Sequence, residues 1–287
     1  MTIRTLKRGR PGYPAALAEL HDPPAVLFVR GERIELLEKP AVAIVGARSC
    51  SAYGAQVARS LARELAAAGL VVVSGLARGV DGEAHRGAIE AGGTTVAVLG
   101  CGIDRDYPAR HAELARRIAE VGLVVAEYPP GTEPAPWRFP ARNRVIAALA
   151  RATVIVEARE RSGALITADF ALELGREVFA VPGEICAALS AGTNGLIRQG
   201  AAPLLGADDV LEALGIAGRP RPAPVLSAGA TALLELLRDG PAGVDELVAR
   251  SRCAAADVAA ALVELELTGL AAQADGVHRA LGTTIAA

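Results

Sequence analysis

Arginines, an asparagine and an aromatic ring gather in one stretch of this chain. Residues 138–144 are Arg-Phe-Pro-Ala-Arg-Asn-Arg, and residues 159–163 are Arg-Glu-Arg-Ser-Gly. Across 138–161 six Arg stand against two Glu, whereas the whole chain has a net charge of −2. Guanidinium groups bind phosphates, and an exposed ring can stack on a base. The stretch predicts a nucleic-acid site, although surface arginines beside a core phenylalanine explain it equally well. The candidate DNA-binding residues here are Arg138, Phe139, Arg142, Asn143 and Arg144.

Glycine-containing turns that follow predicted strands extend this candidate site. Gly46 and Arg48 lie in the first such turn, Ser162 and Gly163 in a later one, and Asn194 in another. Free amide groups where a turn enters a helix bind anions. Turns that follow parallel strands share one edge of the sheet. We therefore expect these five residues to join the DNA-binding residues at that edge.

The sequence lacks the common signatures of catalysis. The first turn does not match GxGxxG, and no acidic residue follows the second strand to hold a ribose. A nucleophile elbow, a Walker A lysine and a CxxC pair are missing, and no base stands beside Ser162. Asp81 and His85 share a helix face but have no third ligand, so we interpret them as a helix cap and a surface or packing histidine. The expectation is a binding protein that is not an enzyme, with no catalytic residue, metal or cofactor.

Six short apolar strands alternate with helices from residue 40 onward. The strands are predicted at 42–45, 71–74, 95–99, 123–126, 153–156 and 177–180, with helices such as 53–68 and 164–174 between them. Strands that are apolar on both faces and separated by helices form a parallel sheet covered on both sides. Right-handed crossovers then give an α/β fold with a Rossmann-like, doubly wound parallel sheet.

Four segments are predicted along the chain. Residues 1–39 are a short N-terminal lead-in with one extra edge strand, and residues 40–216 are the Rossmann-like DNA-binding domain. Residues 217–226 are a Pro-rich linker, because three prolines in five residues deny both helix and sheet. Residues 227–287 carry helices at 230–238, 244–250 and 255–267, then a hairpin around 274–276. Three helices and a hairpin predict a small C-terminal winged-helix domain.

The charge of this last segment argues against DNA reading. It holds four Arg against eight Asp and Glu, a formal charge of −4, and the helix at 255–267 has no Arg or Lys. A helix that enters the major groove needs cations to meet phosphates. We therefore expect the winged helix to contact a protein or to be purely structural.

The apolar runs and the cysteines of the sequence indicate where the protein is located. No run of 18 apolar residues occurs, and no apolar segment follows the basic first residues, so neither a membrane span nor a signal peptide is expected. The four scattered cysteines suit reduced thiols rather than a disulfide framework or a zinc site. A cytoplasmic location is expected.

The ordered set of motifs resembles the DNA-processing protein A (DprA/Smf) family. The segments that carry the resemblance include 43–48 (Ala-Ile-Val-Gly-Ala-Arg), 73–81 (Val-Ser-Gly-Leu-Ala-Arg-Gly-Val-Asp), 139–144 (Phe-Pro-Ala-Arg-Asn-Arg) and 160–168 (Glu-Arg-Ser-Gly-Ala-Leu-Ile-Thr-Ala). Residues 181–183, Val-Pro-Gly, complete the set. One departure is Ala47, which stands where the family more often has Ser.

This resemblance implies both a fold and a function. The fold would be an extended Rossmann domain that binds single-stranded DNA without sequence preference. The function would be to load the RecA recombinase onto incoming DNA in natural transformation, with the protein acting as a homodimer. Arg48 and the segment 139–144 would fall on the DNA-contacting region of the family.

Two other functions remain open at this point. One is a nucleotide-cleaving Rossmann enzyme similar to the phosphoribohydrolases, although their Pro-Gly-Gly-x-Gly-Thr segment is missing where residues 157–163 stand. Release of free base from nucleoside monophosphates would identify it. The other is a scaffold that acts through the acidic winged helix, which truncation after residue 214 would separate from DNA binding.

Overall fold

The structure is a computed structural model that describes residues 3–217, 226–274 and 276–281. The chain divides into two compact units, Met1–Gly218 and Arg219–Ala287. Most of the predicted proline-rich linker at 217–226 lies outside the described residues. Each unit is described by itself.

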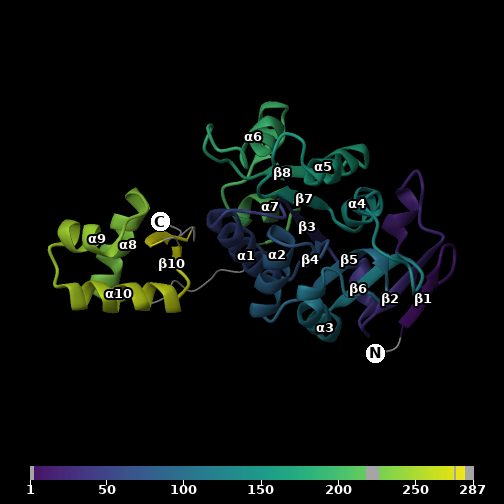
Figure 1. The fold of residues 1–287 in the computed structure, drawn as a ribbon, viewed down its shortest axis with the longest axis horizontal. Helices are drawn as coiled ribbons and strands as arrows, with labels where there is room; N and C mark the ends of the chain where they lie inside the picture. The colour runs from purple at the N-terminus through teal and green to yellow at the C-terminus, as the bar shows by residue number, and fades with distance from the viewer. Residues whose placement is uncertain (1–2, 218–225, 275, 282–287) are drawn as a thin grey trace. The chain divides into compact units, whose positions relative to one another are not determined.

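A nine-stranded sheet forms the first unit, with strand order β1-β2-β6-β5-β4-β3-β7-β8-β9 (Figure 1). The seven strands β6, β5, β4, β3, β7, β8 and β9 are parallel to one another. Strand β2 is antiparallel to its neighbour β6, and β1 is antiparallel to β2. The strands are β1 (Ile3–Lys7), β2 (Val26–Arg30), β3 (Ala41–Val45), β4 (Val71–Ser74), β5 (Thr95–Gly102), β6 (Leu123–Tyr128), β7 (Ala152–Ile155), β8 (Glu177–Ala180) and β9 (Ala202–Pro203). All six strands expected from the sequence are present, and the doubly wound parallel sheet is confirmed.

The expectation of one extra edge strand before residue 40 is wrong. Two strands precede the core, and β2 lies between β1 and β6 rather than at the edge. The sequence of β1, Ile-Arg-Thr-Leu-Lys, conceals its role because only Leu6 is buried. An edge strand with one buried side chain shows no apolar alternation, so the pattern could not reveal it.

Helices cover both faces of the sheet. One face carries α1 (Ala52–Ala67), α2 (Val80–Glu90), α3 (Ala112–Val121) and α7 (Ala207–Ala213). The other carries α4 (Arg138–Leu149), α5 (Gly163–Glu173) and α6 (Ala191–Arg198). Short 3-10 segments stand at Ala15–Glu19, Ile34–Glu38 and Ala109–His111.

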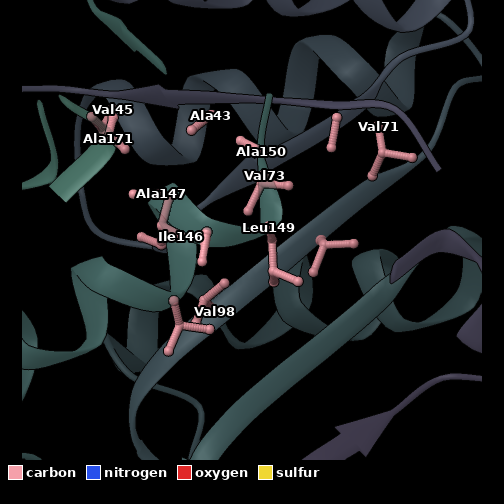
Figure 2. Close-up of a cluster of buried hydrophobic side chains, with 14 of the residues drawn as sticks. Ala43, Val45, Val71, Val73, Val98, Ile146, Ala147, Leu149, Ala150 and Ala171 are labelled. Atoms are coloured by element: carbon pink, nitrogen blue, oxygen red, sulfur yellow. The ribbon is translucent and has the colours of Figure 1, made fainter. Parts of the chain in front are cut away.

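Alternation along the strands builds a separate apolar core on each face. In β3, Val42 and Ile44 pack toward α1 and α2, whereas Ala43 and Val45 belong to the core beneath α4 and α5. Figure 2 shows α4 seated on that second core, with Ile146 and Leu149 near the strand residues Val73 and Val98. This packing fixes α4 across the middle of the sheet.

The course of the chain brings three helix starts to one edge of the sheet. Strand β3 is the switch point, because β4, β5 and β6 lie on one side of it and β7, β8 and β9 on the other. Helices α2, α4 and α5 follow the parallel strands β4, β6 and β7, so each begins near the carboxyl edge. Ligands of doubly wound sheets bind in the crevice outside this edge at the switch point.

The second unit has its own apolar core. It consists of α8 (Ala228–Asp239), α9 (Val244–Ser251), α10 (Ala255–Leu267) and the antiparallel pair β10 (Ala271–Ala274) and β11 (Val277–Ala280). Leu233, Leu247 and Leu265 are among its buried residues. Ala242 adds an antiparallel bridge to His278 of β11. Three helices and a hairpin agree with the outline expected from the sequence.

Close packing of α1 on α2 yields a testable prediction. A methyl group at Gly87 of α2 would lie 2.1 Å from the carbonyl oxygen of Arg59 in α1, so the helices must separate. We expect Gly87→Ala to lower the free energy of unfolding by about 1–3 kcal/mol. Gly195→Ala in α6 is the matched control: a methyl group there meets nothing within 4 Å. It should raise stability by up to about 1 kcal/mol. Thermal denaturation in which both variants melt alike would contradict this account.

Candidate nucleic-acid interface

Turns after β3, β4 and β7 are tied together at the carboxyl edge. The amide of Ala47 donates to the carbonyl of Glu157 at 2.8 Å, and the amide of Val80 donates to the carbonyl of Ala47 at 3.3 Å. Gly46 permits this approach, since a Cβ there would lie 2.7 Å from a methyl group of Val80. Gly46 therefore serves turn packing.

The side chain of Glu157 holds the first turn in place. Its buried carboxylate accepts hydrogen bonds from the amide of Ser51 at 2.8 Å and from the Ser51 hydroxyl at 2.5 Å. A Cβ at Gly54 would lie 2.3 Å from the same carboxylate. Glu157 was counted in the sequence only as a charge opposing the arginines, and its structural use was missed.

A buried arginine and a buried aspartate organise the second turn. Arg142 Nη1 donates to the carbonyl of Gly75 at 2.8 Å and also to the carbonyl of Val98. Asp81 accepts from the amides of Gly75 at 3.1 Å and Ala77 at 3.3 Å. Burial lowers the pKa of Arg142 to about 10, against the opposing effect of Asp81, so the guanidinium stays charged at neutral pH. The loop after β4 is therefore held by Arg142 through a carbonyl and by Asp81 through two amides.

The expectation that Asp81 caps helix α2 is wrong. Gly79 is the N-cap of α2, with φ of 71°, and Asp81 lies in the first turn of the helix with its carboxylate on the preceding loop. Burial raises the pKa of Asp81, while Arg142 is the strongest influence in the other direction. His85 is a packing residue: its Nδ1 lies 2.7 Å from the Thr95 hydroxyl, and burial lowers its pKa to about 3.

Three side chains form a stack above strand β5. The rings of Tyr107 and Phe139 stack with centroids 5.4 Å apart, and the Arg48 guanidinium lies 4.9 Å from the Phe139 centroid. Gly100 makes room for Phe139, since a Cβ there would lie 2.8 Å from the ring. Tyr107 is 42% exposed, so the stack faces solvent on at least one side.

Two adjoining cavities open around this stack. One, of about 280 Å³, lies over the switch point and is lined by residues from the turns after β3 and β7 and from α4. The other, of about 360 Å³, extends toward the loop after β5. Arg48, Ala77, Phe139 and Arg142 line both. The arginine–aromatic stack therefore stands where the two cavities meet.

Seven of the ten residues proposed from the sequence line the first cavity. They are Gly46, Arg48, Phe139, Arg142, Asn143, Ser162 and Gly163. Gly163 is exposed and open, since a Cβ there would meet nothing within 4 Å. The Asn143 amide donates to the Gly163 carbonyl at 3.0 Å, and Ser162 caps α5 by accepting from the amide of Ala164 at 3.3 Å. Helices α4 and α5 are thus joined beside the cavity.

The other three residues are engaged elsewhere. Arg144 donates to both carboxylate oxygens of Glu127, at 2.9 and 2.7 Å. The Asn194 side chain exchanges two hydrogen bonds with the backbone of Gly183, at 3.2 and 3.0 Å. Arg138 stacks beside the rings of two neighbouring aromatic residues. A direct DNA contact by these residues stays a prediction, and their hydrogen bonds give Arg144 and Asn194 structural roles.

Sequence interpretation missed three residues of the second cavity: Arg78, Tyr107 and Arg110. Arg48, Arg78 and Arg110 are exposed, and none forms a hydrogen bond or ion pair with any residue in the described part of the chain. Arg78 stands in the glycine-punctuated turn at 74–81, which was a usable signal. No pattern marks the loop that supplies Tyr107 and Arg110.

Among residues 3–217, 226–274 and 276–281, no group of three or more His, Cys, Asp or Glu could hold a metal ion. No helix within those ranges is both long and apolar enough to span a membrane.

The fold and site define a Rossmann-like protein with an arginine- and aromatic-lined cavity at its switch point and a small C-terminal helical domain. Residues 4–215 match the family described as DNA recombination-mediator protein A, and residues 217–277 match the DprA winged helix domain. The chain belongs to the DNA recombination-mediator protein A (DprA) family. The family resemblance and the winged helix expected from the sequence are both confirmed.

Known relatives resemble the chain over most of its length. It is 46% identical to a putative DNA processing protein DprA of Mycobacterium tuberculosis over 268 residues, covering 90% of this chain and 69% of the relative. A solved DprA structure from Streptococcus pneumoniae is 43% identical with a TM-score of 0.70, covering 73% of this chain and 74% of that one. Another solved structure is that of DNA processing protein A from Helicobacter pylori, and it concerns the single-stranded DNA binding mode of that protein. It is 34% identical with a TM-score of 0.67, covering 74% and 95% of the two chains.

Burial separates two arginines of the site in a testable way. Arg142 is buried and bonded, whereas Arg48 is exposed. Arg142→Ala leaves Asp81 without its strongest favourable charge, so we expect a loss of about 3–5 kcal/mol in unfolding free energy. Arg48→Ala should change it by less than about 1 kcal/mol. Denaturant unfolding measures both, and equal stability of the two variants would show that the buried contacts are unimportant.

Proposed function

We propose that the protein binds single-stranded DNA without sequence preference and loads the RecA recombinase onto it in natural transformation. The observation that carries this proposal is the stack of Arg48, Phe139 and Tyr107 between two cavities at the switch point. It offers a cation for a phosphate and an aromatic surface for a base. The single-stranded DNA binding mode reported for the Helicobacter pylori relative supports the same ligand.

The charge distribution favours a strand that follows the cavities. Arg48, Arg78 and Arg110 are exposed and are free of carboxylate partners in the described residues, so their charges remain available to phosphates. Stacking accepts any base, because every base has an aromatic face. Binding should therefore depend on salt and hardly on sequence.

Absence of activated groups favours binding over turnover. In the described part of the chain, the Ser162 hydroxyl accepts from the amide of Ala164 and has no basic side chain bonded to it. We therefore propose a protein without catalytic activity of its own. Release of base from nucleoside monophosphates would instead support the phosphoribohydrolase alternative.

RecA and a second copy of the chain are the proposed protein partners. Support comes from the family, whose description is that of a recombination mediator. Four free cysteines suit a cytoplasmic site of action. RecA filament growth on DNA already covered by a single-strand binding protein would test the loading step, and growth that is indifferent to this protein would contradict it.

A titration of single-stranded and duplex oligonucleotides at two salt concentrations tests the DNA proposal. We expect tighter binding of the single strand and a fall in affinity as salt rises. Arg48→Ala should weaken binding by about 1.5–3 kcal/mol, through loss of a charged hydrogen bond to phosphate. Arg116→Ala is the matched control, because Arg116 is paired with Glu113 and Glu120 on α3. Equal affinity for duplex and single strand, or equal effects of the two variants, would contradict the proposal.

The winged helix should be dispensable for DNA binding. It has a charge of −4, and α10 carries Asp257, Glu264 and Glu266 but no cation. A chain that ends at Gly218 keeps the whole first unit with its own cores. We expect it to bind single-stranded DNA within about twofold of the full chain, since an acidic surface does not attract phosphate. A large loss of affinity on truncation would assign DNA contacts to the second unit.

A further inference from the structure

An exposed tryptophan stands beside the proposed DNA site, and it has appeared so far only as one of the two rings that Arg138 contacts. Trp137 is 62% exposed, and it is the one tryptophan of the chain. It is the N-cap residue of α4, two residues before Phe139. Large exposed rings are common singly, so exposure alone says little.

The neighbouring arginine gives the ring a fixed setting. The Arg138 guanidinium lies 4.6 Å from the Trp137 ring centroid and 5.1 Å from the Tyr128 centroid. Arg138 Nη1 also donates to the carbonyl of Glu133. The cation is therefore anchored by the backbone and by two rings, and Trp137 is held against it. A ring that is already ordered loses less entropy when a base stacks on it.

Geometry places this ring within reach of a strand in the first cavity. Trp137 and Phe139 are two residues apart, so their Cα atoms are at most about 7 Å from each other. Two helical residues turn by about 200°, so the two side chains leave the start of α4 on nearly opposite sides of its axis. Pro136 and Phe139 both line the first cavity. A strand leaving that cavity past the start of α4 would meet Trp137 next.

We propose that Trp137, held by Arg138, is a second base-stacking site, which takes the base next to the one bound at Phe139. This inference rests on the proposed function and names a residue that adds to it. The ligand is a single-stranded nucleic acid of any sequence, because stacking on an indole does not read base edges.

Intrinsic fluorescence tests the proposal directly, because this chain of 287 residues contains one tryptophan. Titration with oligothymidylate should quench its emission with the same midpoint as the binding curve from a labelled strand. An oligonucleotide of abasic sites, which keeps the phosphates, should bind more weakly and leave the emission unchanged. Unchanged emission during proven binding of oligothymidylate would overturn the proposal.

Variants supply a second measurement that does not depend on fluorescence. Trp137→Ala should weaken binding of oligothymidylate about fivefold or more, and Trp137→Phe should restore most of the affinity, as expected for one lost stacked base. On the abasic strand the three proteins should bind alike. The matched control is Leu205→Ala, which removes an apolar side chain that is 82% exposed.

The outcomes separate this inference from the function beneath it. Salt-dependent binding that Arg48→Ala weakens, with Trp137→Ala equal to Leu205→Ala, would overturn the tryptophan site and leave the proposed function standing. An equal loss on abasic and thymidine strands would also overturn it, since phosphate contacts would then explain the effect. Absence of any single-strand binding by the wild-type protein would overturn the proposed function itself.

Discussion

The guanidinium of Arg142 in α4 is buried and donates to the carbonyls of Gly75, directly after β4, and of Val98, within β5. These bonds fasten the start of α4 to the carboxyl edge of the sheet. Phe139 sits three residues earlier on the same helix and rests on Gly100. The stack with Arg48 and both cavity walls depend on this one attachment.

Burial of a charge is costly unless it is compensated. Asp81 provides the compensating charge, and it accepts from the amides of Gly75 and Ala77, so the loop that Arg142 grips is also held by its partner. Gly75 has to be glycine here, because a Cβ would lie 2.5 Å from Arg142 Nη2 and 2.6 Å from Asp81 Oδ2. Such a network contributes geometry more than stability. It gives the site a fixed loop and a fixed helix start before any ligand arrives.

Sequence periodicity was sufficient for strands β3 to β8 and for the edge at which the proposed site lies, but not for β1 and β9. The apolar strands and the helices between them allow few topologies, but the order of the two halves, and so the switch point at β3, came from the structure. Periodicity could not show the structural or binding role of each individual arginine. Arg142 and Arg144 look like surface cations in the sequence, yet Arg142 is buried and Arg144 pairs with Glu127. Their partners are distant in sequence, so no local pattern could reveal them. Tyr107 was missed for the same reason.

The arginines of the site divide by partner, and under the proposed function that division lets a protein with net charge −2 bind a polyanion. Arg142 donates to backbone carbonyls and Arg144 donates to the carboxylate of Glu127, and these contacts hold the carboxyl edge of the sheet in place. Arg48, Arg78 and Arg110 remain exposed around it. All three line the second cavity, so their charges lie together at the carboxyl edge of the sheet. Under the proposed function, the aromatic rings there favour a single strand, because its unpaired bases can stack on them.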